Sequence, residues 1–315
     1  MTTRPLRVDS VGPSRDAREW LPVAVLLFSA SMWGLAWWPL KAFAAEGLSG
    51  PLLALLTYGA VGTAGLPWLW RERAGWRPET RWLLLIAILG GWGNAAFVSA
   101  MVLGDVVRVM LLFYLAPVWS VLGGRVFLGE AVSRRRGAAV VLALAGAFLV
   151  VGGFKAFDSP LSAADLLALS AGMGFAGNNV VSRAAQAIST VSKTVSLCIG
   201  CGVIALLMLV VAGPPSAAWP APTLPLGVAL VAYSFGGLLL VTATWQWSVT
   251  RLEAGRSGVI AIAELGVALV TASLIGGERL TPHEWLGGAL IMAAALLEAT
   301  DTATPSPSHR TEESA

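Results

Sequence analysis

The 315-residue chain has few charged side chains. Asp, Glu, Lys and Arg make up 12% of it, whereas a soluble globular domain carries roughly 25%. Hydrophobic residues reach 56%, and the mean hydropathy is +0.74. A globular core cannot bury that much apolar surface, so the composition excludes a soluble domain and predicts an all-α integral membrane protein surrounded by lipids. The net charge of +3 comes from arginines placed in particular loops, which indicates membrane orientation and not a nucleic-acid partner.

Histidine and cysteine are also scarce. The two histidines, His283 and His309, lie outside the apolar runs, and Cys198 and Cys201 lie inside one of them. The chain offers no metal-ligand spacing, no nucleophile paired with a base and no Gly-rich phosphate loop. We therefore expect no enzymatic activity, no metal, no cofactor and no ATP-driven step within this chain. The two cysteines are interpreted as small apolar packing residues.

The sequence does contain ten apolar runs joined by short connections. A spanning helix needs about 20 residues, so the chain has room for ten. The first run is longer than the apolar region of a signal peptide, which is about 7–15 residues. The polar ends are predicted to be a cytoplasmic tail, 1–19, and a disordered tail, 300–315. The runs cover roughly 20–43, 51–70, 82–103, 107–128, 137–153, 163–182, 194–212, 225–248, 257–276 and 285–299.

An internal repeat divides the chain into two similar halves. A shift of 148 positions lays residues 104–146 on 252–294. In each copy, two apolar runs flank a Gly-Glu corner, which predicts a helical hairpin. We therefore predict two five-helix repeats, 20–153 and 162–299. The shift aligns Asp105 with Glu253, Arg108 with Arg256, Gly129 with Gly277, Glu130 with Glu278 and Ser133 with Thr281.

The placement of lysine and arginine predicts the orientation in the membrane. The two tails and the connections on the N-terminal side hold 17 of the 21 basic residues. By the positive-inside rule, both termini are cytoplasmic in a multi-pass protein of the inner membrane. Arg108 then faces outward and Arg256 faces inward. The halves are therefore predicted to be inverted repeats, which secondary transporters use to build a site near the membrane midplane.

Several motifs resemble those of EamA-type carriers in the drug/metabolite transporter superfamily. They are Tyr114-Leu-Ala-Pro117, Phe127-Leu-Gly-Glu130 and Ala145-Gly146, Trp33-Gly34 with Lys41, and Asn178-Asn179 with Arg183. The resemblance implies ten helices in an inverted five-plus-five fold, and export of small metabolites or amino acids by exchange or proton coupling. The chain departs from the pattern at the position that matches Pro117. Leu265 stands there, preceded by Glu264.

Glu264 is the leading candidate for a substrate or proton site. It lies near the middle of an apolar run, where an ionisable side chain costs at least about 2.5 kcal/mol unless it is paired or hydrated. Its repeat mate is Ala116, so only one half carries the carboxylate. An asymmetric acid suits a binding site better than a scaffold. The alternative is a protonated glutamate that hydrogen-bonds two helices together.

Other polar and aromatic residues at membrane depth could complete a cavity with Glu264. Amides and hydroxyls there could bind a substrate, but they also join helices at about 0.6–2 kcal/mol each. Deep tryptophans could form an aromatic wall, although tryptophan at helix ends usually marks the membrane interface. The candidates are Trp33, Asn94, Tyr114, Asn178, Asn179, Tyr233, Trp245 and Gln246.

The repeated acid and base at two helix entrances are gate candidates: Asp105 with Arg108, and Glu253 with Arg256. An arginine in the first helical turn is disfavoured by the helix dipole, so each arginine should be paired. The alternative to a gate is a local ion pair three positions apart that caps the helix. Thr281-Pro-His-Glu284 predicts a capping box, and Glu130 and Glu278 are interpreted as structural corner residues.

These features together predict a secondary active transporter that exports a small organic metabolite or amino acid by alternating access. The other class that we keep is a membrane interaction or lipid-handling subunit that does not transport. The sequence does not indicate the substrate, the coupling ion or the oligomeric state.

Overall fold

The computed structural model describes residues 16–116, 118–119, 134–150, 153–154, 161–212, 220–249 and 254–300. At a few of these positions, including Arg183 and Arg256, it describes the backbone alone. The described residues form helices and no strands, so the all-α prediction is confirmed for them. Each of the ten predicted apolar runs contains a described helix. The predictions for Pro117, Glu130, Glu253 and the two tails' distal residues fall outside the described residues.

The first half contains the helices α1 to α8, and the second half contains α9 to α14. The first set is α1 (Asp16–Gly34), α2 (Trp37–Ala45), α3 (Gly50–Arg71), α4 (Arg73–Trp76), η1 (Arg77–Glu79), α5 (Thr80–Leu103), α6 (Val106–Phe113) and α8 (Arg134–Val150). The second set is α9 (Ala163–Ala184), α10 (Thr190–Ala212), α11 (Leu224–Val231), η3 (Ala232–Leu238), α12 (Leu239–Val249), α13 (Ala254–Leu274) and α14 (Pro282–Thr300).

Five of the helical segments are long and apolar enough to cross a membrane. They are Trp20–Ala45, Gly50–Arg71, Arg73–Leu103, Thr190–Ala212 and Leu224–Ser248. Two shorter apolar helices are Gly137–Val150 and Ala263–Leu274. Large apolar side chains also lie on the surface, among them Val211 at 87% and Leu224 at 82% exposure. A surface of this kind is stable in contact with lipid tails, so the structure supports a multi-pass membrane protein.

Two spans are not regular helices. The first apolar run is interrupted between α1 and α2, and Pro39 lies just after the break. Proline has no backbone N–H for the carbonyl group four residues earlier, at Leu35, which accounts for the interruption. The span that begins at Leu224 contains the π-helix η3, which includes Gly236 and Gly237. Such π-helical turns are frequent at functional sites.

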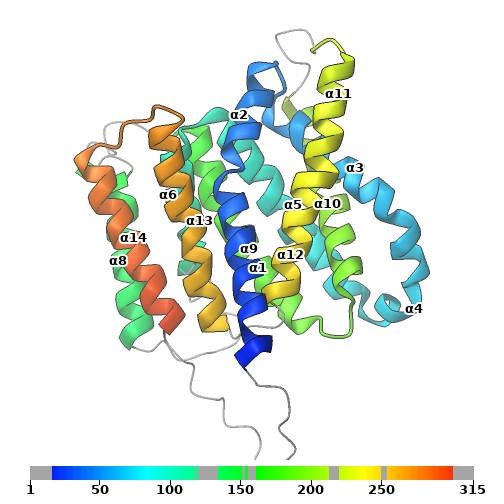
Figure 1. Ribbon diagram of the computed structural model, residues 1–315, viewed down its shortest axis with the longest axis horizontal. Helices are drawn as coiled ribbons and strands as arrows, with labels where there is room; N and C mark the ends of the chain where they lie inside the picture. The colour runs from blue at the N-terminus through cyan, green and yellow to red at the C-terminus, as the bar shows by residue number, and fades with distance from the viewer. Residues whose placement is uncertain are drawn as a thin grey trace, which may run out of the picture.

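Helices from the two halves pack directly against each other. α5 packs against α9 and α10, α3 against α10, α8 against α14, and α1 against α12 and α13. Close approach of α5 and α10 requires glycine, because a Cβ atom at Gly200 would lie 2.0 Å from the carbonyl oxygen of Ala87. Figure 1 shows the start of α1 and the end of α14 at the same end of the bundle.

Candidate functional site

A cavity lies between the two halves of the chain, and seven helices contribute to its wall. α1, α5 and α6 supply residues from the first half, and α9, α10, α12 and α13 supply residues from the second. The cavity therefore belongs to neither half alone. The lining residues are Trp33, Gly93, Asn94, Phe97, Phe113, Phe175, Asn178, Asn179, Leu197, Thr242, Trp245, Gln246 and Glu264.

Glu264 is the acidic residue in this lining. Its side chain comes from the middle of α13 and is buried, with 7% of the residue exposed. The Tyr114 hydroxyl donates a hydrogen bond to its carboxyl group. α1 packs closely over the backbone here, since a Cβ atom at Gly34 would lie 2.6 Å from the Glu264 carbonyl oxygen. Tyr114 thus holds the carboxyl group, while α1 packs against the backbone of the same residue.

The uncharged polar groups of the lining differ in how well they are paired. The Asn94 amide is satisfied, because Tyr58 donates to its Oδ1 at 2.7 Å and its Nδ2 donates to the Gly90 carbonyl at 2.8 Å. Asn178 Oδ1 and Thr242 Oγ1 are buried and have no hydrogen-bond partner within the described part of the chain. A buried oxygen without a partner costs roughly 1–3 kcal/mol. These two oxygens are therefore candidates for contact with a ligand or for pairing in another conformation.

Aromatic rings form the apolar part of the wall. Phe97, Phe113 and Phe175 come from three helices. The Phe113 ring contacts the other two, with centroids 4.9 Å from Phe97 and 5.4 Å from Phe175. Trp33 and Trp245 add indole rings from α1 and α12. A site that combines ring surfaces with a few placed polar groups is typical of small-molecule binding.

Seven of the nine residues proposed from the sequence as substrate or coupling residues line this cavity. They are Trp33, Asn94, Asn178, Asn179, Trp245, Gln246 and Glu264. Tyr114 donates a hydrogen bond to Glu264 but is not among the residues that line the cavity. Tyr233 lies on η3, where its ring packs edge-on against Phe43 at 5.6 Å, also outside the wall. The three phenylalanines were missed because an apolar residue in an apolar run carries no sequence signal.

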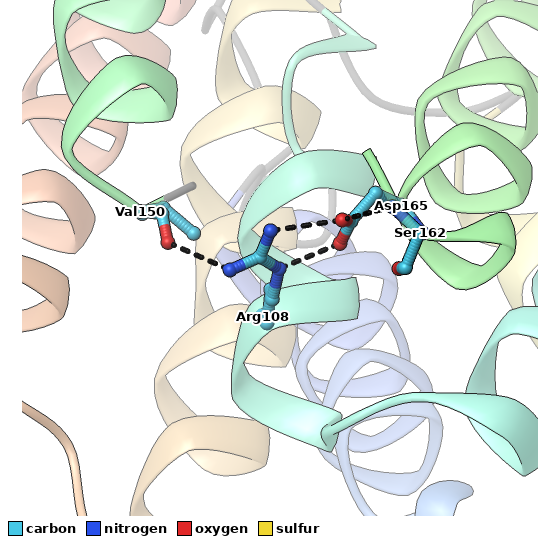
Figure 2. Close-up of polar contacts among 4 residues, drawn as sticks. All are labelled: Arg108, Val150, Ser162 and Asp165. Atoms are coloured by element: carbon cyan, nitrogen blue, oxygen red, sulfur yellow. Dashed lines mark hydrogen bonds and ion pairs between the residues drawn. The ribbon is translucent and has the colours of Figure 1, made fainter. Parts of the chain in front are cut away.

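A second cluster of polar contacts lies at the start of α6, which we call the Arg108 junction. It consists of Lys41, residues 104–108, Val150, Asp165 and Glu278. The Arg108 guanidinium donates from Nε to Asp165 Oδ1 at 2.6 Å and from a terminal nitrogen to Oδ2 at 2.8 Å. A third contact reaches the Val150 carbonyl at 3.4 Å. Figure 2 shows Arg108 between Val150 and Asp165.

The expected ion pair between Arg108 and Asp105 is wrong, although Arg108 is paired. Its partner, Asp165, is the third residue of α9 and is fixed by a capping box with Ser162. The box binds Asp165 through Oδ2, which also accepts from Arg108. A bidentate arginine pair is stronger than a single contact. Asp105 occupies the N-cap position of α6, but its side chain forms no capping hydrogen bond.

Glu278 caps α6 from the other half of the chain. Its carboxylate accepts from the backbone N–H groups of Val106 at 2.9 Å and Val107 at 3.0 Å. The first N–H groups of a helix lack partners within the helix, and its dipole favours an anion there. Lys41 binds beside this point, where its Nζ donates to the Gly104 carbonyl at 2.6 Å. Glu278 therefore joins the two halves, whereas its sequence position predicted only a structural residue at a hairpin corner.

The other predictions for the gates have separate outcomes. Thr281 and Glu284 form the predicted capping box, with their reciprocal bonds at 2.8 Å and 3.3 Å. Glu253 lies outside the described residues, and so does the side chain of Arg256. The second acid-base pair thus stays a prediction.

Comparison with known proteins shows which family the chain matches. The EamA-like transporter family matches residues 20–152 and 162–299. A "Riboflavin transporter" of Rhizobium johnstonii is 25% identical over 91% of this chain and 92% of its own length. A "Probable terminal-alkyne amino-acid exporter" of Streptantibioticus cattleyicolor is 31% identical over 70% of this chain and 74% of its own. One crystal structure, at 18% identity, has a similar fold with a TM-score of 0.57 and covers 88% of this chain and 96% of that one.

Proposed function

Because the chain belongs to the EamA-like transporter family, we propose that it is a secondary transporter that exports a small organic molecule across the inner membrane by alternating access. The cavity carries this proposal. It lies between the two halves, and its wall combines a lone carboxyl group with amides and aromatic rings. A site shared by two halves can open to either side when one half moves against the other.

The helix contacts support a two-fold relation between the five helices of each half, which the proposed inverted arrangement requires. If each helix of one half has an equivalent in the other, every contact between halves should recur with the roles exchanged. The contact of α1 with α13 is matched by that of α9 with α6, and the contact of α5 with α9 is matched by that of α1 with α12. The pairs α3 with α10 and α8 with α14 join equivalent helices to each other. The 148-residue sequence repeat supports the same relation.

The lining suggests which chemistry a substrate brings. Asn178 and Thr242 present buried oxygens without partners in the described residues, and Glu264 adds a carboxyl group, so a ligand with N–H or O–H donors suits this wall. The aromatic rings suit a flat or apolar body. A flavin and an amino acid, the cargoes in the two relatives' names, both have hydrogen-bond donors, so both classes belong in a first substrate panel.

Within this mechanism, Glu264 is the proposed coupling residue, and it binds either a proton or the donor group of the substrate. Asn94, Asn178, Asn179, Trp33, Trp245 and Gln246 are proposed to contact the substrate. Tyr114 is proposed to hold the Glu264 carboxyl in place. The gate candidates remain Arg108 on one face and Arg256, with Glu253, on the other. Both termini are proposed to be cytoplasmic.

Counterflow in proteoliposomes tests the proposal. Vesicles containing the purified protein are preloaded with unlabelled riboflavin or an amino-acid mixture, and uptake of the labelled compound is compared with that of protein-free vesicles. Accumulation that depends on the protein and is abolished by dissipating the preload supports a transporter. Absence of counterflow across a broad panel of flavins, amino acids and amines, with correctly reconstituted protein, would favour a lipid-handling or interaction subunit instead.

A further inference from the structure

The Arg108 junction ties together five segments that are far apart in the sequence. One segment supplies Arg108, the first amides of α6 and the Gly104 carbonyl just before it. Their partners come from α2, the end of α8, the start of α9 and the connection between α13 and α14. Two of these partners, Asp165 and Glu278, belong to the second half of the chain. The junction is therefore a set of polar contacts that joins the two halves at one end of the bundle.

That end is opposite to the end that holds the start of α1 and the end of α14. Figure 1 shows the connection between α13 and α14, which carries Glu278, at the far end of the bundle from these positions. If both termini are cytoplasmic, the junction faces the outside. The inference below does not depend on this absolute orientation.

α6 connects the junction to the cavity. It begins at Val106, which is bound to Glu278, and ends at Phe113, which lines the cavity. Seven of its eight residues are buried, with Arg108 as the exception. Eight helical residues span about 12 Å. α6 thus fills the space between the cavity and this end of the bundle, and it is fixed at the junction.

The ion pair between Arg108 and Asp165 joins a buried acid to a partly exposed base. The Asp165 side chain is 2% exposed and the Arg108 side chain 29% exposed, so the acid is enclosed and the arginine is reachable from water. A buried carboxylate needs such a partner, because an unpaired charge is costly there. Water can still compete for the guanidinium. A pair of this kind can hold one state and release it when the packing around it changes.

We propose that Asp165 and Glu278 are gate residues of the transport cycle. They hold α6 in the position that closes the cavity toward the end of the bundle opposite the termini. This inference rests on the proposed function. Asp165 acts through the bidentate contact with Arg108, and Glu278 acts by capping α6 from the other half. When both contacts release, α6 moves and the cavity opens to that side.

Cysteine accessibility tests the gate without any transported substrate. In a background with Cys198→Ala and Cys201→Ala, Asn179→Cys places a thiol in the cavity wall. A membrane-impermeant, charged methanethiosulfonate reagent is applied from either side of oriented membrane vesicles. A separate His283→Cys reporter, at an exposed position in the first turn of α14 and five residues after Glu278, identifies which side carries the junction.

The thiol at position 179 should be labelled slowly from the junction side in the otherwise unchanged protein. Asp165→Asn and Glu278→Gln should each raise the labelling rate from that side at least fivefold and lower it from the other side. The two-sided change is expected because one cavity cannot open fully to both sides at once. It also separates gating from loosening of the fold, which would raise labelling from both sides.

Two matched controls separate gating from helix capping. Ser162→Ala removes a hydroxyl from the capping box of α9 but keeps the bidentate contact between Asp165 and Arg108. Thr281→Ala removes the hydroxyl from the capping box of α14, three residues after Glu278, and changes no charge near Arg108. Both should leave labelling from the junction side within twofold of the starting rate.

Unchanged labelling in both gate variants, with melting curves that show folded protein, would overturn the inference. Equal increases in the gate variants and the capping controls would overturn it as well, because capping alone would then explain the effect. Since labelling does not depend on substrate, a failed transport assay together with the two-sided shift would contradict the proposed function and leave the gate in place.

Discussion

The Trp37 indole nitrogen donates a hydrogen bond to the Thr271 hydroxyl at 2.9 Å, which joins the first span of one half to α13 of the other. Thr271 lies seven residues after Glu264 on the same helix, so it is on the same face two turns away. Trp37 itself is buried at 5% exposure. The bond therefore helps to set how α13, and with it Glu264, is rotated against α1 and α2.

Thr271→Val should lower the stability of the protein. Valine has nearly the shape of threonine but leaves the buried indole N–H without its acceptor, which costs about 0.6–2 kcal/mol for a bond between membrane helices. The midpoint of thermal unfolding in detergent should fall by a few degrees. Thr271→Ser is the matched control, because it keeps the hydroxyl and should lose less stability than the valine variant. Equal midpoints in the two variants would contradict a role for this bond.

Gly200→Ala should destabilise the contact between α5 and α10. The added Cβ atom would lie 2.0 Å from the Ala87 carbonyl oxygen, so two backbones must move apart. Overpacking of this kind typically costs 1–3 kcal/mol. Gly227→Ala is the control, because a Cβ atom there meets nothing within 4 Å among the described residues and its helix is exposed. Unfolding midpoints of both variants check the prediction, which fails if they shift alike.

Glu264→Gln should lower the transport rate at least tenfold while preserving the fold. The amide keeps the shape of the side chain and can still accept from Tyr114, but it can neither carry a negative charge nor bind and release a proton. Counterflow at several pH values, with wild type and variant at matched reconstitution, measures the effect. A rate lost only under a proton gradient would assign the carboxyl to proton coupling rather than substrate recognition.

The alternative, a structural glutamate, predicts a different pair of results. The glutamine variant would then transport at the wild-type rate across the pH range. Glu264→Leu would lower the thermal stability by leaving the Tyr114 hydroxyl without its acceptor, at about 1–3 kcal/mol. Measuring both variants side by side decides between the two roles.

The membrane orientation gives a prediction that needs no purified protein. Reporter enzymes fused after Ala315 and inserted within residues 71–81 should both be active only as cytoplasmic fusions, because these segments lie on the side rich in lysine and arginine. A periplasmic signal from either fusion would rule out the arrangement with both ends inside. The proposed inverted relation of the two halves would then need a different number of spans.

Local features of the structure could be read from the sequence. The capping box of Thr281 and Glu284 depends on side chains three positions apart. Each of the ten apolar runs contains a described helix, because a run of apolar residues can be recognised from neighbouring positions alone. The break before Pro39 follows from the missing proline N–H and was also readable, although we expected one continuous run. Glu264 could be identified because a carboxyl group within an apolar run is costly at membrane depth unless it is paired or hydrated.

Contacts between distant segments could not be read in this way. Arg108 pairs with Asp165, 57 positions away, and not with Asp105, three positions away. Glu278 binds the amide of Val106 across 172 positions. Spacing along one helix predicts local partners only. Here the fold brings a distant acid close enough to pair with the Arg108 guanidinium, and another close enough to accept from the first amide of α6.

The sequence by itself determined the class of this protein: its composition requires a bilayer, its ten apolar runs predict ten helices, and its repeat predicts two related halves. Only the tertiary structure decided which residues share a site. Nearly every face of these helices is apolar, so hydropathy does not define how each helix is rotated in the bundle. Packing defines it, through close contacts such as that of Gly200 with Ala87, and this rotation brings Phe97, Phe113 and Phe175 to the cavity beside Glu264.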